Sequence, residues 1–158
     1  MRGKKATKRK IAPDPLYGSE LLAKFINKIM WDGKKSIAQK IVYDALDDTT
    51  KKIAKPNVDQ LEVFNKVMSN LKPSVRLRSR RVGGANLQIP VPLDEDQSSF
   101  LIFKWIIDAA RARKGTDMYI RLGAEFLDAY NNTGTGIRKK DEMHKMAEAN
   151  KAYAHFNW

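Results

Sequence analysis

The sequence predicts a mainly α-helical fold of six helices, with a projecting two-stranded β-hairpin between the third and fourth helices. Apolar residues recur at three- and four-residue intervals through most of the chain, which is the period of amphipathic helices. Between residues 73 and 92 this period gives way to strict alternation, interrupted by Gly83-Gly84, which is typical of a hairpin. The chain has 158 residues and is 42% hydrophobic, so it is long and apolar enough to bury a core.

Residues that start or stop helices bound the six expected helices. Ser19 offers the side-chain oxygen of an N-cap, and Gly33 ends the first apolar stripe. Pro56 and Pro73 are poor residues for a helix interior and are expected to end the second and third helices. The fourth helix is apolar nearly all round and is expected at the centre of the core. The expected bounds are 19–33, 36–55, 57–72, 98–114, 117–130 and 139 to the C-terminus, with a loop at 131–136.

The hairpin is predicted to have one cationic face and one apolar face. Side chains alternate between the two faces of a strand, so Arg76, Arg78 and Arg80 share a face. Simple alternation in the second strand groups these arginines with Asn86, Gln88 and Pro90, and sets them opposite Val75, Leu77, Ser79, Leu87, Ile89 and Val91. Proline at two positions on one edge of the second strand also favours a two-stranded ribbon over a larger sheet.

The positive charge is concentrated in two short segments. The formal net charge is +12, and residues 1–10 and 71–92 contribute six and five basic residues with no acidic residue. The rest of the chain is nearly neutral. Such clustering is typical of proteins that bind polyanions. We therefore expect a flexible basic arm at residues 1–18 and a single helical nucleic-acid-binding domain at 19–158, including the hairpin at 73–92.

The candidate binding residues are the lysines and arginines of the arm, the hairpin and three helix ends. The alternative for the hairpin arginines is a charged strand that discourages edge pairing, but lysine and mixed charges would serve that purpose. The alternatives elsewhere are a solubilising arm, and cations that complement a helix C-terminus. The residues expected to contact nucleic-acid phosphates, and rRNA if the partner is ribosomal, are Arg2, Lys4, Lys5, Lys8, Arg9, Lys10, Lys34, Lys35, Lys72, Arg76, Arg78, Arg80, Arg111, Arg113, Lys139 and Lys140.

Several functional classes are not supported by the sequence. Cysteine is absent, and the two histidines, His144 and His155, lie eleven residues apart on one expected helix, too far apart to share a metal ion. No pattern of catalytic residues is present, so we expect neither an enzyme, a cofactor nor a small-molecule substrate. No apolar run is long enough for a membrane span. The remaining alternative is a DNA-bending protein with a β-ribbon arm, although the prolines lie at the base of this hairpin and not at its tip.

Motifs along nearly the whole chain carry a family resemblance. They are Asp14-Pro15 with Tyr17-Gly18-Ser19, Lys24-Phe25-Ile26-Asn27, Asp32-Gly33-Lys34-Lys35, Glu62-Val63-Phe64, Lys72-Pro73, Ser79-Arg80-Arg81-Val82-Gly83-Gly84, Asn131-Asn132-Thr133-Gly134, and His144-Lys145-Met146-Ala147-Glu148-Ala149-Asn150-Lys151-Ala152 with Ala154-His155. With these motifs the chain resembles the bacterial-type small-subunit ribosomal protein number seven family. The hairpin-tip and C-terminal motifs are specific when they occur together.

The resemblance implies a structural protein of the small ribosomal subunit. It implies primary binding to the 3′ domain of small-subunit rRNA, nucleation of head assembly, and a place at the subunit interface near the decoding centre. It also implies contact with small-subunit proteins nine and eleven, and a bacterial cytoplasmic ribosome in preference to an organellar one. The residues that the resemblance places near messenger RNA and exit-site tRNA are Arg81, Val82, Gly83 and Gly84.

Four residues depart from the family pattern. Asp96 and Gln97 stand where the family usually has an arginine pair, so an RNA contact of the usual kind is not expected there. Asn157 replaces a usual arginine before the last Trp. Leu87 replaces a usual tyrosine, which removes base stacking from that position.

Overall fold

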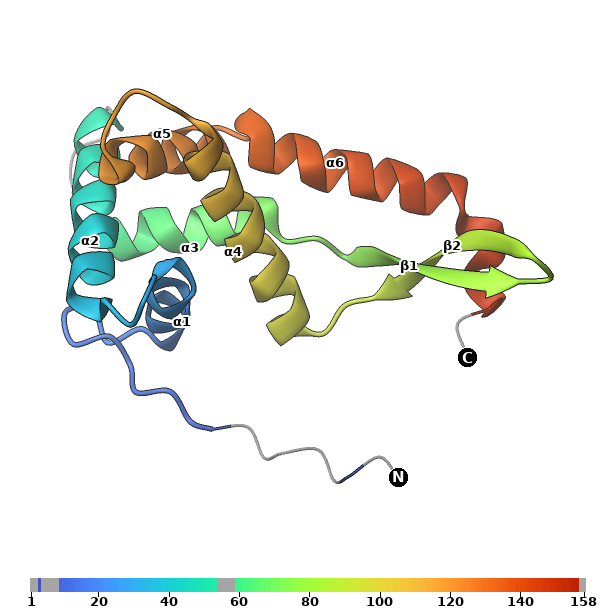
Figure 1. The fold of residues 1–158 in the computed structure, drawn as a ribbon. Coiled ribbons are helices and arrows are strands. Elements are labelled where there is room, and N and C mark those ends of the chain that lie inside the picture. Colours follow the sequence, from blue (N-terminus) through green and yellow to red (C-terminus); the bar gives the residue numbers. More distant parts are fainter. Residues whose placement is uncertain (1–2, 4–8, 54–58, 157–158) are drawn as a thin grey trace. The chain divides into compact units, whose positions relative to one another are not determined.

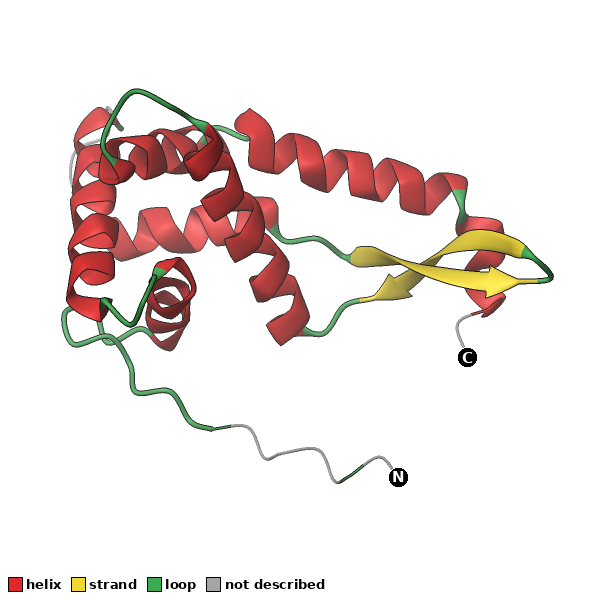
Figure 2. Cartoon of the chain, in the orientation of Figure 1, coloured by secondary structure: helices red, strands yellow, loops and turns green. Residues whose placement is uncertain are grey.

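The structure is a computed structural model that describes residue 3 and residues 9–53 and 59–156 (Figure 1). It divides into two compact units, Met1–Lys40 and Ile41–Trp158, which are described separately. The described elements confirm the predicted fold class: helices predominate, and a two-stranded antiparallel hairpin lies between the third and fourth of them (Figure 2).

The first unit contains helix α1 (Glu20–Ile29) and the start of α2 (Lys35–Lys52). The Ser19 hydroxyl oxygen accepts a hydrogen bond from the Leu22 amide at 3.3 Å, so the predicted N-cap is confirmed. The helix ends earlier than predicted, because Met30 already has an extended ψ of 139°. Gly33, with a φ of +72°, lies in the turn that follows.

The second unit continues α2 and contains every later element. These are α3 (Gln60–Leu71), β1 (Val75–Val82), β2 (Ala85–Pro92), α4 (Glu95–Ala112), α5 (Met118–Tyr130), α6 (Gly134–Ala149) and a 3₁₀ helix, η1 (Lys151–Phe156).

Three predicted helix starts were displaced. The structure begins α3 at Gln60 with Asp59 as its N-cap, whereas the predicted start at Asn57 lies outside the described residues. Helix α4 begins three residues before the predicted start. The prediction missed this first turn because the turn is polar and carries no apolar periodicity. Helix α6 begins at Gly134, inside the predicted loop. The prediction was a loop because two glycines and two threonines at 133–136 are more typical of loops than of helices. The final segment is 3₁₀ and not a continuation of α6.

Helices α3, α4, α5 and α6 contact one another to form the core of the second unit, so the central place predicted for α4 is shared with α5. Helix α4 contacts α3, α5 and α6, and its buried residues include Phe103, Trp105 and Ile106. Phe64 of α3 and Phe126 of α5 are fully buried and meet edge to face, with ring centroids 6.3 Å apart. Such a pair adds to stability beyond the area it buries. The hairpin is therefore attached to a packed helical core, which it contacts through α6.

Helices α2 and α5 approach each other closely at Gly123. The Thr49 hydroxyl donates to the Gly123 carbonyl at 3.1 Å and to the Ala45 carbonyl at 2.7 Å, and the Thr49 side chain is fully buried. A Cβ atom at position 123 would lie 3.2 Å from the Ala45 carbonyl oxygen. Glycine therefore allows the two helix backbones to meet at this crossing.

Candidate nucleic-acid interface

The register of the hairpin overturns the predicted division of its faces. Arg76 pairs with Val91, Arg78 with Ile89, and Arg80 with Leu87. Directly opposed residues of an antiparallel pair lie on the same face of the sheet. The three arginines therefore share a face with the apolar residues of β2, and the prediction of separate cationic and apolar faces was wrong. Because the turn at Gly83-Gly84 has two residues, odd-numbered residues of β1 pair with even-numbered residues of β2. Alternation within a single strand does not show which residues of the two strands are paired.

The face that carries the arginines is partly packed against the C-terminal elements. Strands β1 and β2 contact α6, and β2 also contacts η1 (Figure 1). Ile89 is 1% exposed, and the Arg80 guanidinium donates through Nη1 to the Phe156 carbonyl at 3.1 Å. Arg78 remains exposed. Among these arginines, Arg80 thus helps to hold the C-terminal segment, while Arg78 is accessible to a ligand.

The opposite face near the tip is polar and open. It comprises four exposed residues, which we call the open ribbon face: Ser79, Arg81, Asn86 and Gln88. At the tip, Gly83 and Gly84 have φ values of +57° and +89°, and no atom lies within 4 Å of a Cβ built at either position. Glycine suits this left-handed backbone and leaves the peptide groups of the tip approachable.

Besides Arg80, two more of the predicted RNA-contacting cations of the second unit are engaged within the protein. Arg113 lies 2.7 Å from Glu125 and 2.5 Å from Asp128, both on α5, and Glu125 is 3% exposed. Partial burial of Arg113 acts to lower its pKa, but hydrogen bonds to these carboxylates and their charges outweigh burial, so the pKa is raised above its ordinary value. Lys140 donates to the Asn70 carbonyl at 2.7 Å and so satisfies a carbonyl at the C-terminal end of α3. Both side chains therefore connect helices of the scaffold.

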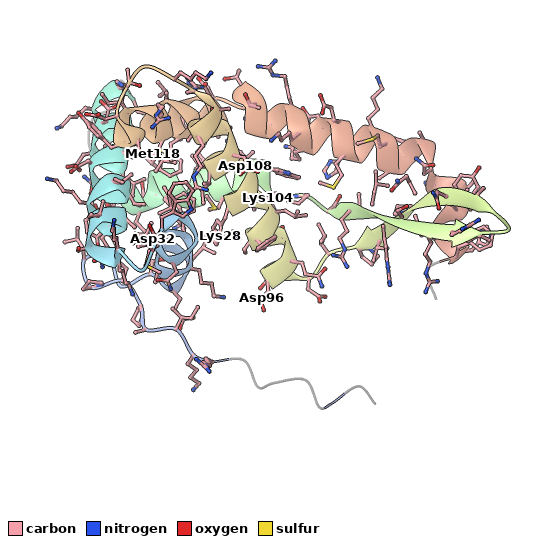
Figure 3. The ribbon with its side chains drawn as sticks, viewed as in Figure 1. Lys28, Asp32, Asp96, Lys104, Asp108 and Met118 are labelled. Atoms are coloured by element: carbon pink, nitrogen blue, oxygen red, sulfur yellow. The ribbon has the colours of Figure 1, made fainter. Side chains whose placement is uncertain are left out.

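The remaining predicted cations of the second unit lie nearer the surface. Lys72 lies 3.8 Å from Glu95, in a solvent-exposed pair of the kind that contributes little to stability. Arg111 is exposed at the end of α4, and Lys139 is half-buried near the start of α6. Along α4 itself the exposed charges are of both signs, and they include Asp96, Lys104 and Asp108 (Figure 3). The exposed side of α4 therefore does not extend the basic surface.

The cations of the first unit lie at its arm and at the turn before α2. Arg9, Lys10, Lys34 and Lys35 are exposed, whereas Arg2, Lys4, Lys5 and Lys8 lie outside the described residues. Sequence reasoning did not single out Trp31, which precedes the two lysines and is 72% exposed. The sequence signal for the exposure of Trp31 was its position beside an Asp-Gly turn, because residues in turns lie at the surface.

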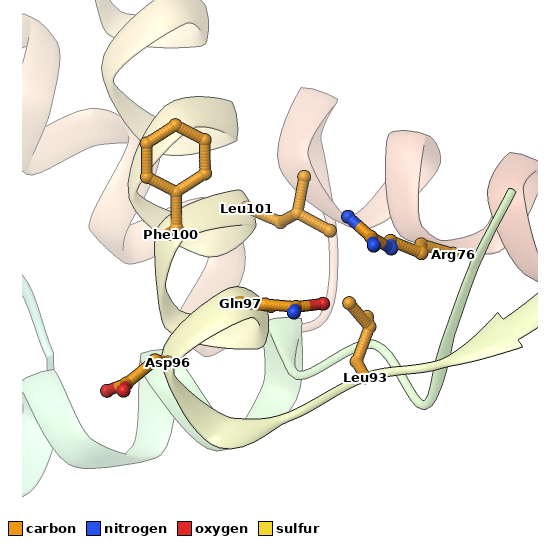
Figure 4. Close-up of a pocket in the computed structure, with 6 residues that line it drawn as sticks. All are labelled: Arg76, Leu93, Asp96, Gln97, Phe100 and Leu101. Atoms are coloured by element: carbon orange, nitrogen blue, oxygen red, sulfur yellow. The ribbon is translucent and has the colours of Figure 1, made fainter. Parts of the chain in front are cut away.

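A pocket at the base of the hairpin was also not predicted. It has a volume of about 280 Å³ and is lined by Arg76, Leu93, Asp96, Gln97, Phe100 and Leu101 (Figure 4). Its residues come from β1, from the segment after β2 and from the first turns of α4. No sequence pattern joins these three segments, so only the fold brings them together.

The two histidines lie on different elements, which corrects the prediction of one shared helix. His144 lies in α6 and His155 in η1. The His144 ring accepts a hydrogen bond at Nε2 from the Ser74 amide at 3.2 Å, which links α6 to the start of the hairpin. Among the residues that the structure describes, no group of three potential metal ligands converges. Within the same residues, no helix combines the length and apolar character that crossing a membrane requires.

Comparison with known proteins identifies relatives over the full chain. The family model described as ribosomal protein S7p/S5e matches residues 1–151. The chain is 52% identical over its whole length to the entire small ribosomal subunit protein uS7 of Thermotoga neapolitana. It is 51% identical, again over the full length of both chains, to the proteins of the same name from Fervidobacterium nodosum and Pseudothermotoga lettingae.

Proposed function

Because the chain belongs to the ribosomal protein S7p/S5e family, we propose that it is a primary binding protein for the 3′ domain of small-subunit rRNA and nucleates assembly of the subunit head. Members of this family are structural proteins of the ribosome, and the chain is not an enzyme. The single observation that carries the proposal is the match of the family model to residues 1–151.

The hairpin is the structural feature that best supports RNA contact. Arg78 and Arg81 are exposed cations on opposite faces of the hairpin, and the open ribbon face supplies amide and hydroxyl groups beside Arg81. A-form RNA hides its base edges in a deep, narrow groove, so recognition rests on phosphates, 2′-hydroxyls and unpaired bases. The exposed lysines and arginines of the arm and of the turn before α2 add phosphate contacts.

The hairpin tip is proposed to lie at the subunit interface, near the decoding centre, messenger RNA and exit-site tRNA. Its glycine backbone permits close approach of a second RNA, and Arg81 supplies a cation beside it. Small-subunit proteins nine and eleven are the proposed protein neighbours, and a bacterial cytoplasmic ribosome is the proposed location. The alternative of a DNA-bending protein needs an apolar wedge at the tip, where this hairpin has Gly83-Gly84.

Salt-dependent binding to a 3′-domain rRNA transcript tests the proposal. The logarithm of the binding constant should fall linearly with the logarithm of salt concentration, with a slope of about −0.7 to −0.9 per neutralised phosphate. Removing residues 1–10 should make the slope shallower, while an unchanged slope would assign the arm to solubility. In cells, the protein should sediment with small subunits. Sedimentation with nucleoid DNA would contradict the proposal.

A substitution at the tip separates assembly from tRNA contact. Subunits carrying Arg81→Ala should assemble normally and retain exit-site tRNA less well, because the arginine lies on the open ribbon face, away from the packed side of the hairpin. Failure of head assembly would instead assign Arg81 to the rRNA site, and normal assembly with unchanged tRNA retention would remove the proposed role of the tip.

A further inference from the structure

The pocket at the base of the hairpin contains an arginine with unused hydrogen-bonding capacity. Arg76 extends from β1 toward the first turns of α4 (Figure 4). In the described part of the chain, its Nε is buried and has no hydrogen-bond partner. Because this Nε has almost no accessible surface, a ligand in the pocket can reach the guanidinium only through its Nη groups. Leu93 and Leu101 lie near the end of the guanidinium and supply apolar walls.

The surroundings of the pocket disfavour a phosphate group as the ligand. Asp94, Glu95 and Asp96 are consecutive exposed residues at the start of α4, and their carboxylates already complement the positive end of the helix dipole. A phosphate beside Arg76 would be repelled by these charges and would also be desolvated by the apolar walls. A ligand with apolar faces and neutral acceptors on one edge is compatible with both features.

We propose that this pocket binds one unstacked guanine base of the RNA partner. The proposal rests on the proposed function, which makes small-subunit rRNA that partner. The two Nη groups of an arginine form a two-donor fork, and guanine presents two adjacent acceptors, O6 and N7, on one edge. The faces of the base lie between apolar side chains, as is usual for bases splayed out of single-stranded RNA.

The amide of Gln97 adds a second polar group at the rim. Its Nε2 donates to the Asp94 carboxylate at 3.4 Å, which leaves its carbonyl oxygen available to accept from a base. Guanine carries such donors on its N1 and N2 atoms. An amide that both donates and accepts at the rim is suited to the edge of a base.

Replacing Arg76 by lysine separates base recognition from simple charge attraction. Arg76→Lys keeps the positive charge but loses the planar fork, and these two residues are not equivalent at a two-donor site. Binding to the 3′-domain transcript should weaken about tenfold, with no change in the salt slope. The matched control is Arg78→Lys, an exposed arginine on the same strand, which should change affinity less than about twofold because a phosphate contact needs only a point charge.

Methylation of guanine N7 by dimethyl sulfate gives a direct readout. One guanine should be protected at N7 in the complex with the wild-type chain and with Arg78→Lys, and exposed in the complex with Arg76→Lys. Filling the pocket with Leu101→Trp should remove the same protection without altering the charge. Thermal unfolding of each variant verifies that it is folded, and Gln97→Leu serves as a second, smaller change if Leu101→Trp does not fold.

Three outcomes would overturn the proposal. One is binding and N7 protection by Arg76→Lys equal to those of the wild-type chain, which would reduce Arg76 to a phosphate contact. Another is that no guanine is protected at N7 by the wild-type chain and left unprotected by Arg76→Lys. The third is unchanged RNA binding by Leu101→Trp together with loss of a neighbouring protein from reconstituted subunits, which would assign the pocket to a protein side chain. If the wild-type chain fails to bind the transcript at all, the proposed function fails instead, so the two failures are distinguishable.

Discussion

The crossing of α2 and α5 provides a sharp test of the packing. We predict that Gly123→Ala destabilises the protein, although alanine is the better helix former. The new Cβ would lie 3.0 Å from the Asp48 Oδ2, 3.2 Å from the Ala45 carbonyl oxygen and 3.4 Å from the Thr49 Oγ1. Asp48 can rotate away, but the Ala45 carbonyl belongs to the α2 backbone and moves only with the helix.

The size of the effect follows from two opposing contributions. Overpacking a close contact costs about 1–3 kcal/mol, and replacing glycine by alanine within a helix contributes about 1 kcal/mol of stabilisation. Displacing α5 also lengthens the 3.1 Å hydrogen bond from Thr49 to the Gly123 carbonyl. We expect a net loss of about 1 kcal/mol, which corresponds to a decrease in Tm of about 3 °C for a chain of this size.

Thermal and urea unfolding, followed by circular dichroism, measure this loss. The matched control is Gly136→Ala in α6, where the nearest obstacle is the Leu71 Cδ2 at 3.1 Å, the end of a buried side chain and not a backbone atom. The control should therefore be less destabilised than Gly123→Ala. If Gly123→Ala is as stable as the control, the α2 backbone yields easily and the crossing is not closely packed.

Two further predictions concern the hairpin and the helix-end ion pairs. Ile89→Asp should lower the free energy of unfolding by about 3 kcal/mol, because it places a charge at a position that is 1% exposed. The control Gln88→Asp, at the exposed neighbouring position, should change the free energy of unfolding by less than about 0.5 kcal/mol. Equal effects of the two variants in urea unfolding would mean that the assigned faces are wrong. Arg113→Met should cost about 2 kcal/mol, because it leaves the buried Glu125 carboxylate without its 2.7 Å partner, and the double variant with Glu125→Gln should recover part of that loss. The absence of any recovery would show that Arg113 acts through packing of its side-chain stem and not through its charge.

The number and type of elements could be predicted from local patterns, but several helix bounds could not. Apolar periodicity identifies α1, α3 and α5 because each buries one stripe of side chains. It does not identify the first turns of α4 and α6, which begin with Glu95 and Gly134 and carry no apolar stripe. In α6 the first turn buries Gly136 and Ile137, so packing against the rest of the fold decides where this helix begins, and propensity does not represent packing.

The faces of the hairpin show the same limit more clearly. Alternation along each strand was read correctly, but the phase between the strands depends on the number of residues in the turn. Pairing of Val82 with Ala85 sets Arg78 opposite Ile89, so the arginines and the apolar residues of β2 share a face. A shift of one residue in register exchanges the two faces, which is why strand sequences considered separately could not decide the outcome.

The sequence by itself determined the helical class, the presence of a two-stranded hairpin, the concentration of positive charge and the family. These depend on composition and on spacing within short segments, which are local properties. Only the tertiary structure decided which cations remain available to RNA, since Arg113 and Lys140 are held by partners on α5 and α3. It also created the pocket at Arg76 from three segments that are separate in the sequence. Side-chain partners across such distances are selected by packing of whole elements, and packing is a property of the folded chain.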